Sequence, residues 1–154
     1  MKKHTNRKVW GLGHLLLPKQ RDDIVLPAHI ALNAMETGAG ELIHRHTIAA
    51  FLNITGFCAA RMVGTSSETR EAIDAAKYAL VDADRRYLRT NKWGFTGPEM
   101  LLIRHAVTLA DHLLKRANSQ MLTNAVAFVS KCNEEAAPTG TLGTCSMPLQ
   151  MVAA

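Results

Sequence analysis

Apolar residues recur at three- and four-residue steps along most of this chain, which is the spacing that gathers them on one face of an α-helix. They are densest between residues 41 and 63, so we expect the central helix there. No long segment alternates apolar and polar residues with a period of two, as a half-buried strand would. The pattern predicts an all-α, single-domain bundle of about five helices, at residues 22–36, 41–63, 65–90, 96–117 and 119–135.

Short polar and glycine-containing segments mark where the predicted helices begin and end. Thr37-Gly38-Ala39-Gly40 and Gly64 are typical helix stops. Thr65-Ser66-Ser67-Glu68 and Thr96-Gly97-Pro98-Glu99 both fit a capping box, in which the first and fourth residues satisfy each other's free backbone N–H groups. We therefore expect Thr65 to cap the third helix and Thr96 to cap the fourth.

The same spacing predicts which residues face the core. In the first helix the expected inward residues are Ile30, Ala31, Ala34 and Met35. In the fifth helix they are Leu122, Ala125, Val126, Val129 and Cys132.

The distribution of charge and of Gly and Pro residues divides the chain into three parts. Residues 1–21 contain six Lys and Arg residues and no acid, whereas the rest of the chain holds 12 bases and 13 acids. The net charge of +5 therefore comes from a basic N-terminal arm, residues 1–21, and not from the helical domain at 22–136. Four Gly and Pro residues in the last part predict a loose tail at 137–154.

The basic arm is a candidate partner-binding segment, because clustered cations attract acidic or polyanionic surfaces. Trp10 lies within it and can bury a large apolar area against a partner. Two alternatives stay open: the arm is only a solvated tail, or Trp10 packs on the core of the same chain. The candidate contact residues of the arm are Lys2, Lys3, Arg7, Lys8 and Trp10.

A second basic cluster lies at the end of the third predicted helix and in the loop that follows. Arginines one helical turn apart can grip phosphates or carboxylates, and a neighbouring aromatic residue can stack or insert. The alternatives are structural: cations stabilise a helix C-terminus, and Trp93 and Phe95 can staple the third and fourth helices together, with Phe95 packing toward Met100. Separately, Asp82 and Arg86 are four residues apart in the order that favours an ion pair on one helix. The candidate contact residues of this cluster are Arg85, Arg86, Arg89, Lys92 and Trp93.

No constellation of catalytic or ligand-binding type stands out, so we expect no enzyme, no cofactor and no metal. His44 and His46 are two apart and diverge on a helix, and Cys58 falls on an apolar face where a thiol is usually inert. The odd number and wide spacing of Cys58, Cys132 and Cys145 argue against a disulfide framework and fit a reducing cytoplasm. No stretch is apolar for long enough to cross a membrane.

Two segments, KKHTNRKVWGL at 2–12 and RRYLRTNKWGFTGPEMLLIRHAVTLAD at 85–111, resemble small, mostly uncharacterised accessory proteins of phages and prophages of Proteobacteria. The resemblance covers about a quarter of the chain and carries no catalytic motif, so it transfers no functional residue. It implies a phage-encoded protein. Such proteins often block a host machine, CRISPR effectors included, or regulate phage genes.

Together these observations favour a non-enzymatic helical protein that binds a host protein or nucleoprotein complex. The alternative is a transcriptional regulator that binds nucleic acid directly through the same basic groups. A helix-turn-helix formed by the third and fourth helices is disfavoured, because their connection is long and the exposed charges of the fourth helix are mixed. Whether two copies pair into a homodimer is left open.

Overall fold

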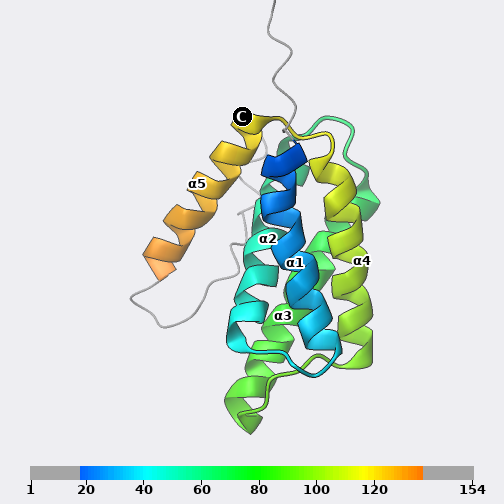
Figure 1. The fold of residues 1–154 in the computed structure, drawn as a ribbon, viewed down its shortest axis with the longest axis vertical. Helices are drawn as coiled ribbons and strands as arrows, with labels where there is room; N and C mark the ends of the chain where they lie inside the picture. Colours follow the sequence, from blue (N-terminus) through cyan, green and yellow to red (C-terminus); the bar gives the residue numbers. More distant parts are fainter. Residues whose placement is uncertain (1–17, 137–154) are drawn as a thin grey trace, which may run out of the picture.

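The computed structural model describes residues 18–136, and these form five α-helices and no strand. The helices are α1 (Pro18–Glu36), α2 (Leu42–Arg61), α3 (Ser67–Thr90), α4 (Gly97–Leu114) and α5 (Ser119–Ala136) (Figure 1). The prediction of an all-α bundle of about five helices is confirmed. Residues 1–17 and 137–154, which hold most of the expected arm and all of the expected tail, lie outside the described residues.

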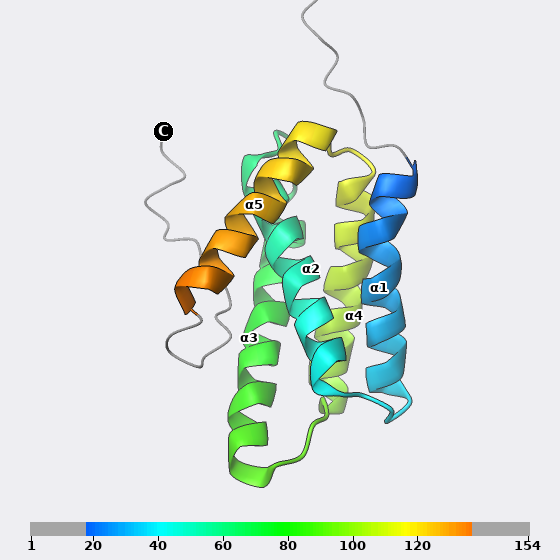
Figure 2. The same ribbon diagram turned by 60° about the vertical axis from the view of Figure 1, so that its left-hand side comes forward.

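Helix α2 is the centre of the bundle, as its apolar density predicts. It packs against α1, α3, α4 and α5, while α3 also packs against α4 and α1 against α4. Figures 1 and 2 show α1 to α4 running side by side and α5 crossing α2 at an angle. The largest fully buried apolar side chains come from α2, α3 and α4, namely Ile48, Leu52, Cys58, Ile73, Leu80, Ile103, Val107 and Leu114.

Helix α1 differs from its prediction at both its start and its buried face. It begins at Pro18, where the missing proline N–H costs nothing, so residues 18–21 are helical although the arm was expected to reach 21. It also continues through Pro27, which lies on the exposed face, where water can satisfy the carbonyl that this proline leaves free. Ile30 is 57% exposed, so the prediction that it faces the core is wrong.

The buried face of α1 is set by its position between α2 and α4. A helix that touches two neighbours buries the side that points into the space between them. Its core residues are Val25, Ala28, Ala31, Leu32 and Met35. Among the described helices, α5 contacts only α2. Its Leu122, Ala125 and Val129 are buried, but Val126 is 42% exposed, so the prediction that Val126 faces the core is wrong.

One of the two predicted capping boxes is confirmed. The Thr96 hydroxyl accepts a hydrogen bond from the Glu99 N–H, and the Glu99 carboxylate accepts one from the Thr96 N–H. The cap of α3 is Ser66, whose hydroxyl accepts from the Thr69 N–H at 3.2 Å, and not Thr65. Thr65 instead donates its hydroxyl to the Met62 carbonyl at 3.0 Å, at the end of the preceding turn.

Replacing Ser66 with Ala is expected to lower the free energy of unfolding by about 1 kcal/mol, because the Thr69 N–H loses its cap. Replacing Thr65 with Ala is the matched control and should cost less than about half as much, because the Met62 carbonyl still accepts the backbone N–H of residue 65. Urea denaturation followed by circular dichroism measures both. A larger loss for the Thr65 variant would contradict the assignment of Ser66 as the cap.

Candidate interaction surface

The C-terminal end of α3 extends beyond the adjacent ends of α1, α2 and α4 (Figures 1 and 2). The helix ends at Thr90, and its C-cap, Asn91, adopts a left-handed conformation with φ 53° and donates its N–H to the Tyr87 carbonyl at 2.7 Å. Asparagine tolerates this conformation better than most residues, so it can replace the usual glycine here. The chain then reverses and returns through residues 92–96 to the start of α4.

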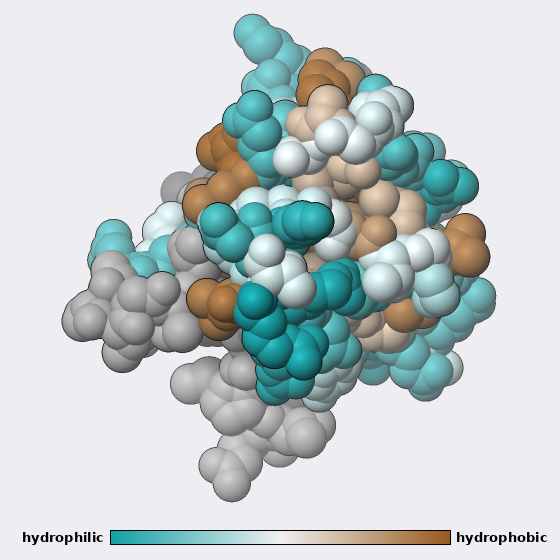
Figure 3. Space-filling model, turned by 90° about the horizontal axis from the view of Figure 1, so that it is seen from below, coloured by the Kyte–Doolittle hydropathy of each residue, from teal (hydrophilic) through white to brown (hydrophobic). Residues whose placement is uncertain are grey.

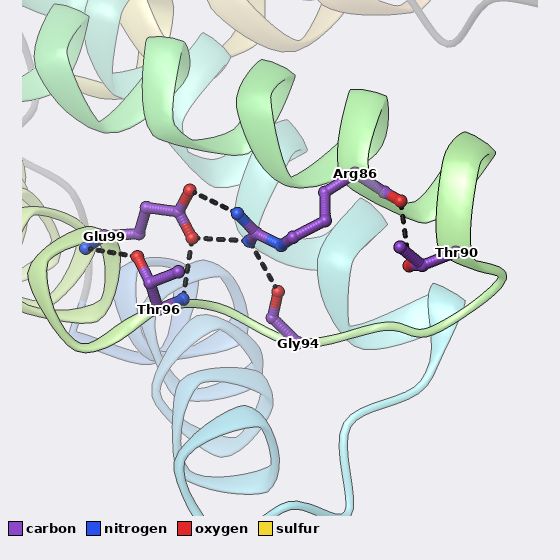
Figure 4. Close-up of polar contacts among 5 residues, drawn as sticks. All are labelled: Arg86, Thr90, Gly94, Thr96 and Glu99. Carbon is purple, nitrogen blue, oxygen red and sulfur yellow. Dashed lines mark hydrogen bonds and ion pairs between the residues drawn. The ribbon is translucent and has the colours of Figure 1, made fainter.

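Arg86 forms hydrogen bonds that hold the loop of residues 92–96 against the bundle (Figure 4). Its Nη1 and Nη2 atoms donate to the two Glu99 carboxylate oxygens at 2.9 and 2.6 Å, and Nη2 also donates to the Gly94 carbonyl at 2.9 Å. The hydrogen bond with Arg86 lowers the pKa of Glu99, although partial burial opposes that shift. The same bond raises the pKa of Arg86, so both groups stay charged at neutral pH.

Two further contacts brace the segment. Trp93 stacks on Tyr87 with ring centroids 4.3 Å apart and an interplanar angle of 19°. Phe95 and Met100 both pack against the core, and the packing of one against the other stays a prediction. The loop is therefore held at three points: by an ion pair, by a ring stack and by the core.

No hydrogen bond or ion pair joins Asp82 to Arg86, although the Asp82 charge contributes to the raised pKa of Arg86. Asp82 is bound by Arg85, whose Nη1 lies 3.2 Å from the carboxylate, on the exposed face of α3. Arg86 points to the other side of the helix and reaches Glu99. The bidentate geometry with a half-buried carboxylate is the stronger of the two choices for a guanidinium.

Three cations at this end are exposed: Arg85, Arg89 and Lys92, which we call the basic tip. Within residues 18–136, Arg85 pairs only with the exposed Asp82, and no side-chain hydrogen bond or ion pair is found for Arg89 or Lys92. Figure 3 views the molecule from this end and shows hydrophilic residues at and below the centre of the view, with a continuous pale brown, mildly hydrophobic area beside them. The tip is therefore charged, accessible and free to meet a partner.

The other predicted contact residues divide into two groups. The principal contacts of Arg86 and Trp93 are internal to the fold, and their additional use by a partner stays a prediction. The arm residues lie outside the described part of the chain; they are Lys2, Lys3, Arg7, Lys8 and Trp10.

A buried ion pair joins α2 to α3, and sequence reasoning missed it. Arg45 is only 2% exposed, and its guanidinium donates to both Asp84 carboxylate oxygens, with Nε 2.8 Å from Oδ1. Burial lowers the pKa of the neighbouring His46, and the Arg45 charge adds to that shift while Asp84 opposes it. The available signal was the spacing of Arg45, Ala49 and Leu52, which places an arginine on the buried stripe of α2.

Residues suited to metal binding are scattered over the fold. Among residues 18–136, no three His, Cys, Asp or Glu side chains lie close enough to hold a metal ion. His44 has a structural task, since its Nδ1 atom accepts the Glu41 N–H at 3.0 Å at the start of α2. Cys132 is disulfide-bonded, contrary to the expectation from the number and spacing of the cysteines.

Cys58 is fully buried, and burial raises the pKa of its thiol to about 11. We expect iodoacetamide at pH 8 to label it at least about 100-fold more slowly in the folded protein than in urea, because only the thiolate reacts. Peptide mapping by mass spectrometry reports the two rates. Equal rates would mean that Cys58 is accessible and not the inert core thiol described here.

No family model, no curated protein and no solved structure matches this chain. Within the described part, no helix has the length and apolar character that crossing a membrane requires.

Proposed function

We propose that this chain is a helical binding protein without catalytic activity, which attaches to a host protein or nucleoprotein complex in the bacterial cytoplasm. The observation that carries the proposal is the basic tip, whose cations are exposed and contribute little to the fold. The basic arm, residues 1–21, is proposed as a second contact. The resemblance of residues 2–12 and 85–111 to phage accessory proteins supports an inhibitor of a host defence system, of anti-CRISPR type.

The contacts that hold the backbone of the basic tip in place support the proposal that the tip binds a partner. Binding costs less conformational entropy when the contacting groups are already held in place than when a loop must become ordered on binding. The bonds from Arg86 to Glu99 and Gly94, together with the stack of Trp93 on Tyr87, hold the backbone that carries Arg89 and Lys92. The backbone under the exposed cations is therefore already fixed, and only their side chains must become ordered when a partner binds.

A protein surface is favoured over naked nucleic acid by the apolar residues beside the tip. Leu88 is 82% exposed and lies between Arg85 and Arg89 in the sequence. Phosphate groups gain nothing from a leucine, whereas an acidic protein surface with an apolar pocket can use both kinds of contact. Direct binding to nucleic acid is therefore the second candidate, and salt dependence separates the two.

Reversing two charges at the tip, Arg89→Glu with Lys92→Glu, is expected to reduce recovery of the partner from a host lysate at least about tenfold. The matched control is Lys115→Glu with Lys131→Glu, which makes the same change in net charge at exposed positions just after α4 and on α5, outside the basic arm. The full-length protein serves as bait, with and without nuclease. Equal recovery by both variants would remove the tip from the proposal.

The same experiment in 50 and 200 mM salt identifies the kind of partner. Three phosphate contacts would lower the affinity about 40-fold over this range, because bound counterions are released. A protein partner anchored by apolar contacts should show a much shallower dependence. Loss of the partner on nuclease treatment together with the steep dependence would favour the nucleic-acid regulator.

A further inference from the structure

Lys77 lies at the interface of α2 and α3, where a glycine makes room for its side chain. It is partly buried, and a β-carbon added at Gly56 of α2 would lie 2.6 Å from its Nζ atom and 3.3 Å from its Cε atom. The shorter distance is well inside van der Waals contact, so the amine end of Lys77 rests against α2 only because residue 56 has no side chain. Ile73, one turn earlier on α3, reaches the same point with its Cγ2 atom 3.5 Å away.

The amine of Lys77 has no polar partner in the described part of the chain, where no hydrogen bond or ion pair is found for it. Burial lowers the pKa of this amine, and the charge of Asp74 opposes that shift only in part. Within the same part, the side-chain polar atoms that are sealed from water without a partner belong to His46, Asn53 and Asp111, so the Lys77 amine is open to solvent on one side. Lys77 therefore presents a reachable amine whose surroundings favour its uncharged, nucleophilic form.

From this placement we propose that Lys77 is an acylation site, at which the amine takes an acyl group from a small acyl thioester. The amine nitrogen attacks the thioester carbonyl carbon and forms the carbon–nitrogen bond. The carbon–sulfur bond breaks, the thiolate leaves, and the nitrogen loses a proton to solvent. The product is an uncharged amide.

The burial of the site favours an acyl donor over carbon dioxide, another small electrophile that an uncharged amine attacks. Carbon dioxide would leave a carbamate, which is an anion, beside the apolar Ile73 side chain and the α2 backbone. An amide carries no charge and costs less to keep in a partly buried place. Acylation also removes the cost of holding a cation there without a counter-ion.

The acylation site goes beyond the proposed function and can fail without affecting it. Lys77 lies in the middle of α3, about three helical turns before Arg89, and is no part of the basic tip. A change at Lys77 is therefore expected to leave the cations of the tip in place.

Acetyl coenzyme A at pH 8, with peptide mapping by mass spectrometry, tests the site in the full-length protein. Lys77 should be acetylated at least about threefold faster than the exposed Lys19 and Lys92, because a larger share of its amine is uncharged. In urea the three rates should become similar. An equal or slower rate at Lys77 in the folded protein, or an advantage that persists in urea, would overturn the proposal.

Gly56→Ala tests the geometry without removing the lysine. The added methyl group takes the space of the Lys77 amine and should move it into water, and the variant should fold because the flexible side chain can give way and alanine favours a helix. The rate at Lys77 should then fall to that of Lys19 and Lys92, with an unchanged circular dichroism spectrum. The matched control is Gly94→Ala, where no atom lies within 4 Å of the added methyl group, and it should leave the rate at Lys77 unchanged. A folded Gly56→Ala variant that keeps the fast rate would contradict the proposal.

Discussion

Replacing Asp84 with Ala is expected to lower the free energy of unfolding by about 3 kcal/mol. The cost arises at Arg45, which the substitution leaves charged, 2% exposed and without its carboxylate partner. Asp84 itself retains some access to water, with 31% of its side chain exposed, so we expect the low end of the range for broken buried pairs. Urea denaturation at pH 7, followed by circular dichroism, measures the loss.

Two controls separate the pair from a general sensitivity of α3. Glu71→Ala removes an exposed carboxylate from the same helix and should change stability by less than about 0.5 kcal/mol. Arg45→Met combined with Asp84→Ala removes the buried charge and should regain most of the loss, since apolar groups of similar volume often replace buried pairs without cost. A loss of less than about 1 kcal/mol for Asp84→Ala would mean that water reaches Arg45.

Arg45 also shows where sequence reasoning stops. The three- and four-residue spacing predicts α2 and its central position correctly, because these depend on local periodicity. The spacing places Arg45 on the buried stripe of α2, but the carboxylate that pairs with it lies 39 residues away on another helix. Only the packing of α2 against α3 brings the two together, and no local pattern contains that information.

The smaller errors have the same origin. Whether Ile30 or Leu32 faces the core depends on which neighbours α1 touches, and both choices satisfy a helical period. Thr65 and Ser66 are both good caps, and the path of the chain after α2 decides between them. At the basic tip, composition identifies the cluster, but only the structure separates the braced Arg86 from the exposed Arg85, Arg89 and Lys92.

Replacing Glu99 with Gln is expected to cost about 2 kcal/mol at pH 7 and to loosen the loop that carries the basic tip. Glutamine cannot give Arg86 two charged acceptor oxygens, and it weakens the bond that the Thr96 N–H makes to Oε2 at 2.7 Å. Hydrogen exchange should speed up in residues 91–96. The matched control, Glu71→Gln, removes an exposed carboxylate from α3 and should leave both measurements nearly unchanged.

The pH dependence identifies the carboxylate as the source of this stability. The folded protein holds the pKa of Glu99 below its ordinary value of 4.5, chiefly through the hydrogen bond from Arg86, so unfolding raises that pKa. The stability from Glu99 is therefore fully present above its ordinary pKa and is lost as the pH falls through the folded value. The gap between wild type and Glu99→Gln should narrow from pH 7 to pH 3. A gap that stays constant would assign the loss to altered packing around Thr96 instead of to the ion pair that holds the tip.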